Sequence, residues 1–274
     1  MLQYEFMQNA LFVSVCISLL CPCIGIFMVL RRSSMIGDTM SHASLAGITL
    51  GLLTQTNPVL GAFFFTSLCG ALIEYLRKYF PKHLDLILTV VLSMSVGIAI
   101  TLISSGKLRT NANIFFFGSI LTVSASDMLW IFLLTAGSVF ALYRMYDAML
   151  YIAYDEDAAR IAGVKVTLVN YAFAVLTAAA VSVSIKIVGV LVLSSMVALP
   201  VACALQLEKG FRTTLLTSVA FSLTAMLLGL SGAYLLNVAP GGFISLTSVG
   251  LLLCTVLVKY LGRRLCTRTT GRKA

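Results

Sequence analysis

The sequence predicts an all-α protein: a polytopic bundle of about nine transmembrane helices (eight or nine) in one domain, residues 1–274. Hydrophobic residues make up 59% of the chain, charged residues make up 11%, and the mean hydropathy is +1.01. A soluble domain is usually about 45–50% apolar and about 25% charged, so this chain has too little polar surface for a water-soluble globule. Its apolar runs are continuous rather than alternating, which indicates helices and not the strands of a membrane barrel.

Nine apolar segments follow one another along the chain, and each approaches the length of about 20 residues that a membrane-spanning helix needs. They cover residues 10–30, 35–55, 58–76, 85–105, 127–146, 167–186, 188–206, 213–236 and 243–261. The stretch 113–124 is apolar but too short to cross, and we expect a short helix there that lies at one face or re-enters. A count of eight spans would require one pair of segments to be merged or one segment to be dropped, and the uncertain segments are 35–55 and 167–206. Small residues such as Gly47 in the second segment predict close helix packing.

The basic residues predict the orientation of the chain in the membrane. If the basic tail, 262–274, is cytoplasmic, nine spans place sixteen of the 19 lysines and arginines on the inner side. Only Lys107, Arg109 and Lys186 then fall outside. Because cytoplasmic loops retain Lys and Arg, we expect the N-terminus outside and the C-terminus inside. The net charge of +9 therefore reflects orientation and does not indicate a nucleic-acid partner.

One inner loop, 154–165, holds three of the ten acidic residues in a row. Asp155 can cap a short helix there, its acidic neighbours suit the positive N-terminus of a helix, and Gly163 suits the C-terminal cap. We expect this helix to dock onto a cytoplasmic partner through a small contact surface formed by Ala158, Ala159 and Ile161. The alternative is a solvated loop.

Asp38 and His42 lie inside the second predicted span, where ionisable side chains are costly and are functional candidates by default. Their i, i+4 spacing places both on one helix face. A carboxylate with an imidazole suits manganese, iron or zinc better than calcium or a purely soft copper site. Two ligands do not close a coordination sphere, so further ligands or water must come from elsewhere. The alternative is an Asp–His ion pair that locks two spans together.

With these features in order, the chain resembles the membrane permeases of bacterial zinc/manganese/iron ATP-binding-cassette importers. The resemblance covers nearly the whole chain. It rests on four segments: 31–45, with its double arginine and Gly37-Asp38 followed by His42; 117–121 with 126–127; 155–164; and 186–192 leading to 199–202.

The resemblance implies a fold similar to that of cobalamin and siderophore importer permeases, in the bacterial cytoplasmic (inner) membrane. It also implies a second permease subunit, two cytoplasmic ATP-binding subunits and an extracytoplasmic solute-binding protein that delivers the ion. It assigns metal contact to Asp38 and His42, and places a possible outer gate at Gly118 and Ser119. Coupling to the ATPase falls on a helix near 155–164, at Asp155, Glu156, Ala158, Ala159, Ile161 and Gly163.

Mechanistically, the sequence lacks a G-x-x-x-x-G-K-[ST] phosphate loop, so this subunit is not expected to be an enzyme. No permanently bound cofactor is expected, because the divalent metal ion is the cargo. A secondary transporter that uses Asp38 as a proton site is the alternative. An intramembrane aspartyl protease is disfavoured, because Asp147 and Asp155 fall at or beyond a cytoplasmic span end. The choice among the three metals, and between a homodimer and a heterodimer, stays open.

Overall fold

The computed structural model describes residues 5–31, 33–106, 113–118, 125–236 and 238–270, and every regular element in these ranges is an α-helix. The long helices are α1 (Glu5–Leu30), α2 (Met35–Leu53), α3 (Pro58–Tyr79), α4 (Leu84–Ser104), α6 (Ala125–Tyr154), α8 (Val166–Val188), α9 (Val190–Leu205), α10 (Phe211–Leu236) and α11 (Pro240–Thr270). Two short helices, α5 (Asn113–Phe117) and α7 (Glu156–Ile161), stand between them.

Local sequence sets several of the helix ends. Asn57 begins α3 by accepting a hydrogen bond from the backbone N–H of Val59, and Pro58 occupies the first turn, where its missing N–H costs nothing. Gly189 separates α8 from α9 with a φ of +80°, a conformation that favours glycine. The chain therefore changes direction within one residue between two apolar helices.

The centre of the bundle is formed by α1, α2, α8 and α9. In the most apolar stretch of α8, 83% of the residues are buried, and the corresponding share in α1 is 72%. In α11 that share is only 17%, because α3, α4, α6, α10 and α11 surround the centre and turn apolar side chains outward. This pattern is typical of a membrane protein, where lipid covers the outer apolar surface.

The predicted number of spans is not confirmed. Each of the nine predicted segments falls on a helix, but seven helices among the described residues are long and apolar enough to cross a membrane: α1, α3, α4, α6, α8, α10 and α11. The second segment, α2, has 19 residues but is more polar, since it carries Asp38, His42 and four hydroxyl side chains. The helix α9 has only 16 residues.

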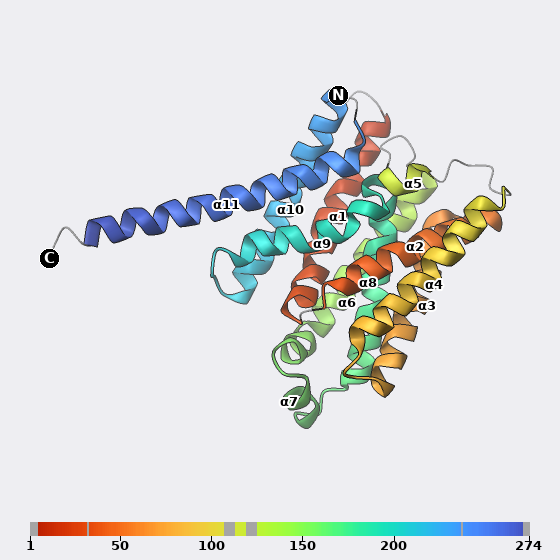
Figure 1. Ribbon diagram of the computed structural model, residues 1–274, viewed down its shortest axis with the longest axis horizontal. Coiled ribbons are helices and arrows are strands. Elements are labelled where there is room, and N and C mark those ends of the chain that lie inside the picture. The colour runs from red at the N-terminus through yellow and green to blue at the C-terminus, as the bar shows by residue number, and fades with distance from the viewer. Residues whose placement is uncertain (1–4, 32, 107–112, 119–124, 237, 271–274) are drawn as a thin grey trace.

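The two short helices lie at opposite ends of the bundle (Figure 1). The helix α5 lies near the end from which α1 starts, and α7 lies at the other end, below α6 and α8. On one flank, α3 and α4 run beside α2, and on the other side α10 packs against α11, whose C-terminal half projects away from the bundle. The expected short helix at 113–124 is thus present over Asn113–Phe117, and its remainder, 119–124, lies outside the described residues.

The helices α2 and α3 approach each other closely at glycine. A Cβ atom added to Gly47 would lie 2.6 Å from the carbonyl oxygen of Gly61, and a Cβ atom on Gly61 would lie 2.6 Å from the carbonyl oxygen of Gly47. Neither position has room for a side chain, which is the use of small residues that the sequence predicts. The close approach holds α2 and α3 together as one unit.

Candidate functional site

Asp38 and His42 lie in the first two turns of α2 and face the same side of the helix. Asp38 Oδ1 and His42 Nε2 are 4.0 Å apart, which is too long for a hydrogen bond. The Asp38 side chain is 46% exposed and the His42 side chain 25% exposed, so the pair lies on an open face of the single chain. Both residues belong to one helix, and their contact therefore does not lock two spans together.

The other polar side chains of α2 have their hydrogen-bonding needs met within the helix. Thr39, Ser41, Ser44 and Thr49 are buried and donate to backbone carbonyl oxygens three or four residues earlier, at 2.6 to 3.2 Å. The O–H donors of these hydroxyl groups are therefore satisfied by the helix backbone. On α2, the Asp38 carboxylate and the His42 imidazole are the side chains of the types that transition-metal ions prefer.

One chain supplies an incomplete metal site. Among the residues that the structure describes, no three His, Cys, Asp or Glu side chains come close enough together to hold a metal ion. Transition-metal ions such as Zn²⁺ take about four ligands in proteins. Asp38 and His42 can therefore contact a metal ion, but they cannot enclose it.

At the other candidate site, the loop 154–165 forms the short capped helix that the sequence predicts. The Asp155 carboxylate accepts hydrogen bonds of 3.0 Å from the backbone N–H groups of Asp157 and Ala158 and so caps the N-terminus of α7. At the other end Gly163 has a φ of +84°. Its N–H donates to Arg160 O, and the next N–H, of Val164, donates to Ala159 O. These paired bonds form a Schellman cap, so a six-residue helix is fixed at both ends.

The outer surface of α7 differs from the prediction at one residue. Ile161 is 89% exposed and Ala158 is also exposed, as a contact surface requires. Ala159, however, is only 1% exposed and packs into the hydrophobic core. Its assignment to the contact surface is wrong, because α7 lies against the bundle on the face that carries Ala159.

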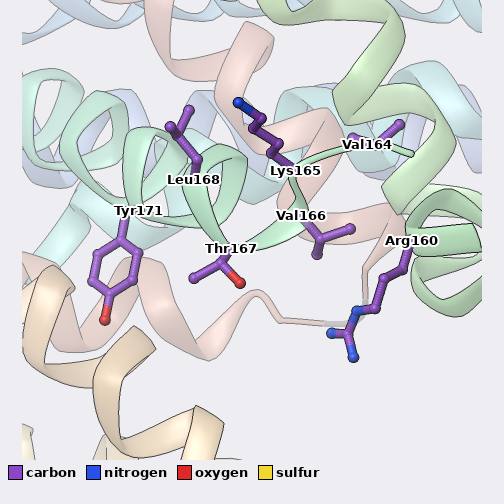
Figure 2. Close-up of a pocket in the computed structure, with 7 residues that line it drawn as sticks. All are labelled: Arg160, Val164, Lys165, Val166, Thr167, Leu168 and Tyr171. Atoms are coloured by element: carbon purple, nitrogen blue, oxygen red, sulfur yellow. The ribbon is translucent and has the colours of Figure 1, made fainter. Parts of the chain in front are cut away.

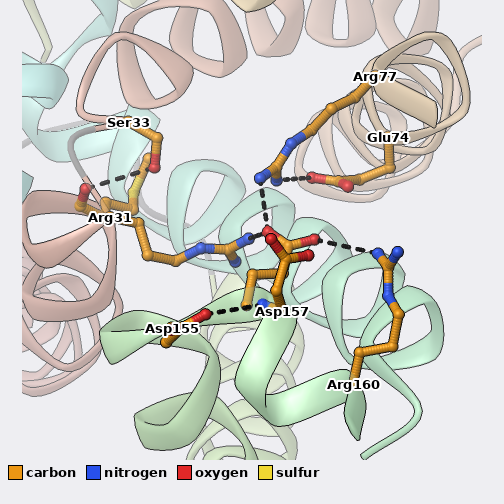
Figure 3. Close-up of polar contacts among 9 residues, drawn as sticks. Arg31, Ser33, Glu74, Arg77, Asp155, Asp157 and Arg160 are labelled. Carbon is orange, nitrogen blue, oxygen red and sulfur yellow. Dashed lines mark hydrogen bonds and ion pairs between the residues drawn. The ribbon is translucent and has the colours of Figure 1, made fainter. Parts of the chain in front are cut away.

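An ion-pair cluster that the sequence did not reveal joins α7 to the bundle (Figure 3). The Glu156 carboxylate accepts a 2.9 Å hydrogen bond from Arg77 Nη2, and it lies 3.7 Å from Arg31 Nη2 and 3.8 Å from Arg160 Nη2. Glu74 adds a second carboxylate 3.6 Å from Arg77. The cluster thus connects the short helix to the C-terminal ends of α1 and α3.

Within this cluster, Arg31 is the most enclosed cation, with an 11% exposed side chain. Burial lowers the pKa of its guanidinium, and the positive charge of Arg77 lowers that pKa further, whereas Glu74 and Glu156 act in the opposite direction. The guanidinium also lies 5.8 Å from the ring centre of Phe173, a cation–π distance. Arg31 therefore depends on these two carboxylates for its charge balance.

At the opposite end of the bundle, three glycines allow three backbone segments to cross. Gly118, with a φ of +74°, leaves no space for a Cβ atom against the carbonyl of Ile187. Gly189 packs against the backbone of 116–118, and Gly241 packs against the carbonyl of Val188. The predicted gate residue Gly118 thus lies at the junction of α8 and α9, and its predicted companion Ser119 lies outside the described residues.

A buried ion pair lies near this crossing. Lys186 Nζ donates to Asp127 Oδ2, and both side chains are at most 7% exposed. Asn57 Nδ2 donates to the other carboxylate oxygen of Asp127 at 3.0 Å. The sequence had placed Lys186 among the outer basic residues; a lone lysine beside an apolar run was the only signal of a buried pair.

A surface pocket beside α7 is lined by residues of α7, α8 and the turn between them, and by none of α2. It measures ≈ 570 Å³ and follows the turn from α7 into α8 (Figure 2). In Figure 2, the charged ends of Lys165 and Arg160 point to different sides, so they do not converge on one ligand. These two side chains therefore do not form one charged binding site in this pocket.

Comparison with known proteins decides the family. The model of the ABC 3 transport family matches residues 3–259, which is most of the chain. The chain belongs to this family. Membership agrees with the resemblance drawn from the four sequence segments.

Among relatives of this ABC 3 family protein, a "Probable metal transport system membrane protein" of Treponema pallidum is 49% identical, over 96% of this chain and 99% of the relative. A "Probable iron transport system membrane protein" of Haemophilus influenzae is 30% identical, over 89% of this chain and 90% of the relative. The "Manganese import system permease protein ScaB" of Streptococcus gordonii is 30% identical, over 95% of each chain.

A solved structure titled "PsaBC from Streptococcus pneumoniae in complex with Fab" has the same fold. It aligns with a TM-score of 0.83 at 27% identity, over 93% of this chain and 92% of the other. The helical fold of the ABC 3 family protein is thus one already seen in a solved structure.

Proposed function

We propose that this chain is the membrane permease subunit of an ATP-binding-cassette importer that carries a divalent transition-metal ion, zinc, manganese or iron, across the cytoplasmic membrane. The observation that carries the proposal is the half-exposed Asp38–His42 pair on the polar helix α2 of an ABC 3 transport family member. Relatives named for metal, iron and manganese transport support the class of cargo.

The exposure of the pair supports a pathway between two permease subunits. A carboxylate and an imidazole in contact with lipid would be costly, so this face of α2 must border water or protein. A second permease placed against this face would supply further ligands around the same path. Each subunit then contributes an incomplete set, which binds an ion weakly enough to release it.

The two ends of the bundle support separate roles for α5 and α7. At the inner end, α7 presents the exposed side chains of Ala158 and Ile161 for docking to an ATP-binding subunit. At the outer end, the backbone crossing at Gly118 helps to close the pathway after an extracytoplasmic binding protein delivers the ion. Hydrolysis of ATP belongs to the partner subunit, since this chain has no phosphate loop.

We place the N-terminus outside and the C-terminus in the cytoplasm, on the strength of the distribution of basic residues. A fluorescent protein fused after residue 274 should fluoresce, because we place that end in the cytoplasm. Alkaline phosphatase fused before residue 1 should be active, because that enzyme is active only outside the cytoplasm, where we place the N-terminus. The reverse pattern of the two reporters would contradict this orientation.

Dependence on ATP separates an ABC importer from a secondary transporter that uses Asp38 as a proton site. The permease is reconstituted into vesicles with its ATP-binding subunits and binding protein, and uptake of Mn²⁺, Zn²⁺ and Fe²⁺ is measured separately. We expect ion uptake only when ATP is present on the side of the vesicle membrane that carries the ATP-binding subunits. Uptake by the permease alone, driven by a proton gradient, would select the secondary transporter.

A further inference from the structure

The Glu156 cluster lies where α7 meets the bundle. One pair of atoms in it, on Arg31 and Glu156, is slightly too far apart for a hydrogen bond. Arg31 Nη2 is buried and has no hydrogen-bond partner within the described part of the chain, although Glu156 Oε2 is only 3.7 Å away. Arg77 Nη2 already bonds the same oxygen at 2.9 Å. A buried donor that lacks a partner needs an explanation. A shift of α7 by less than 1 Å would complete the bond or separate the two groups.

Arg31 stands at the corner that leads into α2. Its backbone N–H donates to Phe27 O and ends α1, and two residues later Ser33 donates to Met28 O from both its N–H (2.9 Å) and its hydroxyl (3.3 Å). These bonds brace the corner, as Figure 3 shows for the Ser33 hydroxyl. A force on the Arg31 side chain therefore reaches the start of α2, which carries Asp38 in its first turn.

Arg77 gives α7 a second connection to the same unit. It lies in the last turn of α3, and α3 is held against α2 by the glycine contact between Gly47 and Gly61. The Glu156 carboxylate thus holds both the corner before α2 and the end of α3. Asp157, the next acid on α7, is exposed and makes no side-chain ion pair among the described residues.

We propose that Glu156 is a positioning residue that transmits movement of α7 to the α2–α3 unit through Arg31 and Arg77. When the docked ATP-binding subunit moves α7, the Arg31–Glu156 contact changes, and α2 moves with its Asp38–His42 pair. This inference rests on the proposed function. It predicts that loss of the Glu156 charge uncouples ATP hydrolysis from ion movement, while the subunits stay assembled.

The test uses the complete transporter in vesicles, with Glu156→Gln as the main variant and Asp157→Asn as the matched control. The measured quantity is the number of Mn²⁺, Zn²⁺ or Fe²⁺ ions taken up per ATP hydrolysed. Glu156→Gln should still co-purify with the ATP-binding subunit and hydrolyse ATP, but this ratio should fall at least about fivefold, the lower range of coupling between sites. Asp157→Asn should keep the wild-type ratio, because it removes an equal charge outside the cluster.

A merely structural role would lower assembly, hydrolysis and uptake together and leave the ratio unchanged, and that result would overturn the inference. Equal losses in Glu156→Gln and Asp157→Asn would overturn it as well. Arg31→Gln leaves the Arg77–Glu156 bond in place, so it tests the connection if Glu156→Gln fails to assemble, and its ratio should fall too. The double variant should be no worse than Glu156→Gln, whereas additive losses would contradict a shared connection.

Failure of the proposed function gives a different result. A wild-type complex that takes up none of the three ions with ATP and binding protein present would overturn that function, and this inference with it. A wild type that transports, beside an unchanged ratio in Glu156→Gln, overturns the inference alone.

Discussion

Asp38 and His42 differ from the other polar residues of α2 in the chemistry of their side chains and in what those side chains face. The hydroxyl groups of the helix donate to its own backbone, whereas the carboxylate and the imidazole face an open side. Their separation of 4.0 Å leaves each group able to bind a ligand of its own. The candidate ion contact is thus a carboxylate and an imidazole that share one open face of α2.

At Gly118, both the backbone conformation and the packing exclude a side chain. Its φ of +74° alone would cost an alanine about 1–2 kcal/mol. The contact with Ile187 O adds an overpacking cost of about 1–3 kcal/mol. We expect Gly118→Ala to lower the thermal unfolding temperature of the detergent-purified transporter.

Gly106→Ala is the matched control, because Gly106 has a similar φ of +68° but open space around its Cβ position. Its unfolding temperature should therefore fall less. Equal decreases in the two variants would show that the backbone crossing is looser than described.

The residue-scale features that the sequence predicted are those set within one turn of helix. The i, i+4 pair and the Asp155 cap each depend on neighbours at most four residues away. The Glu156 cluster instead joins residues 79 apart in the chain, as in the Arg77–Glu156 bond, and no local spacing encodes such a contact. Ala159 was assigned to the surface for a related reason: its burial depends on how α7 packs on the bundle.

Among the helices, the start of α6, the end of α8 and the cap of α3 are joined by one buried polar group. Asp127 accepts from both Lys186 and Asn57. Removing one partner from a buried pair typically costs about 3–5 kcal/mol, because the remaining charge is left unpaired. We expect Lys186→Met to destabilise the purified transporter by roughly this amount, measured by thermal or denaturant unfolding.

Two further variants test the origin of that loss. Lys259→Met removes an exposed pair with Glu208, whose side chain is 62% exposed, and should change stability little. The double variant Asp127→Asn/Lys186→Met should lose less than the sum of its single changes. A Lys186→Met variant as stable as Lys259→Met would contradict the assignment of a buried pair.

The sequence predicted the positions of the helices better than it predicted where the helices end and how many of them span the membrane. Continuous apolar runs marked the nine long helices, because the bilayer requires them. Hydropathy ends where the membrane ends, whereas backbone hydrogen bonding continues, so α6 extends to Tyr154 and α11 to Thr270. The helix α2 shows how polar residues affect the count of spans. Its polar residues indicate function, and because of them α2 is not among the seven apolar spans.

For the whole molecule, the described fold is one of the two permease subunits that we propose enclose the ion pathway. One end of its bundle is braced at α7 by the Glu156 cluster, and backbone segments cross tightly at Gly118 at the opposite end. The polar pair of α2 lies on an open face of the single chain. A solved structure has the same fold and aligns with 93% of this chain at a TM-score of 0.83. A second subunit on the open face of α2 would complete the path.

Metal uptake by an Asp38 variant tests whether the open face of α2 contacts the transported ion. Cells that lack the native gene receive the wild type, Asp38→Asn, or Asp85→Asn as a control for loss of an exposed acid elsewhere. The initial rates of Mn²⁺, Zn²⁺ and Fe²⁺ accumulation are compared at equal membrane expression. Loss of even an outer partner of a metal ligand costs about 10- to 100-fold, so Asp38→Asn should lower the rate at least about tenfold while Asp85→Asn keeps it. Wild-type accumulation by Asp38→Asn would show that Asp38 does not contact the transported ion.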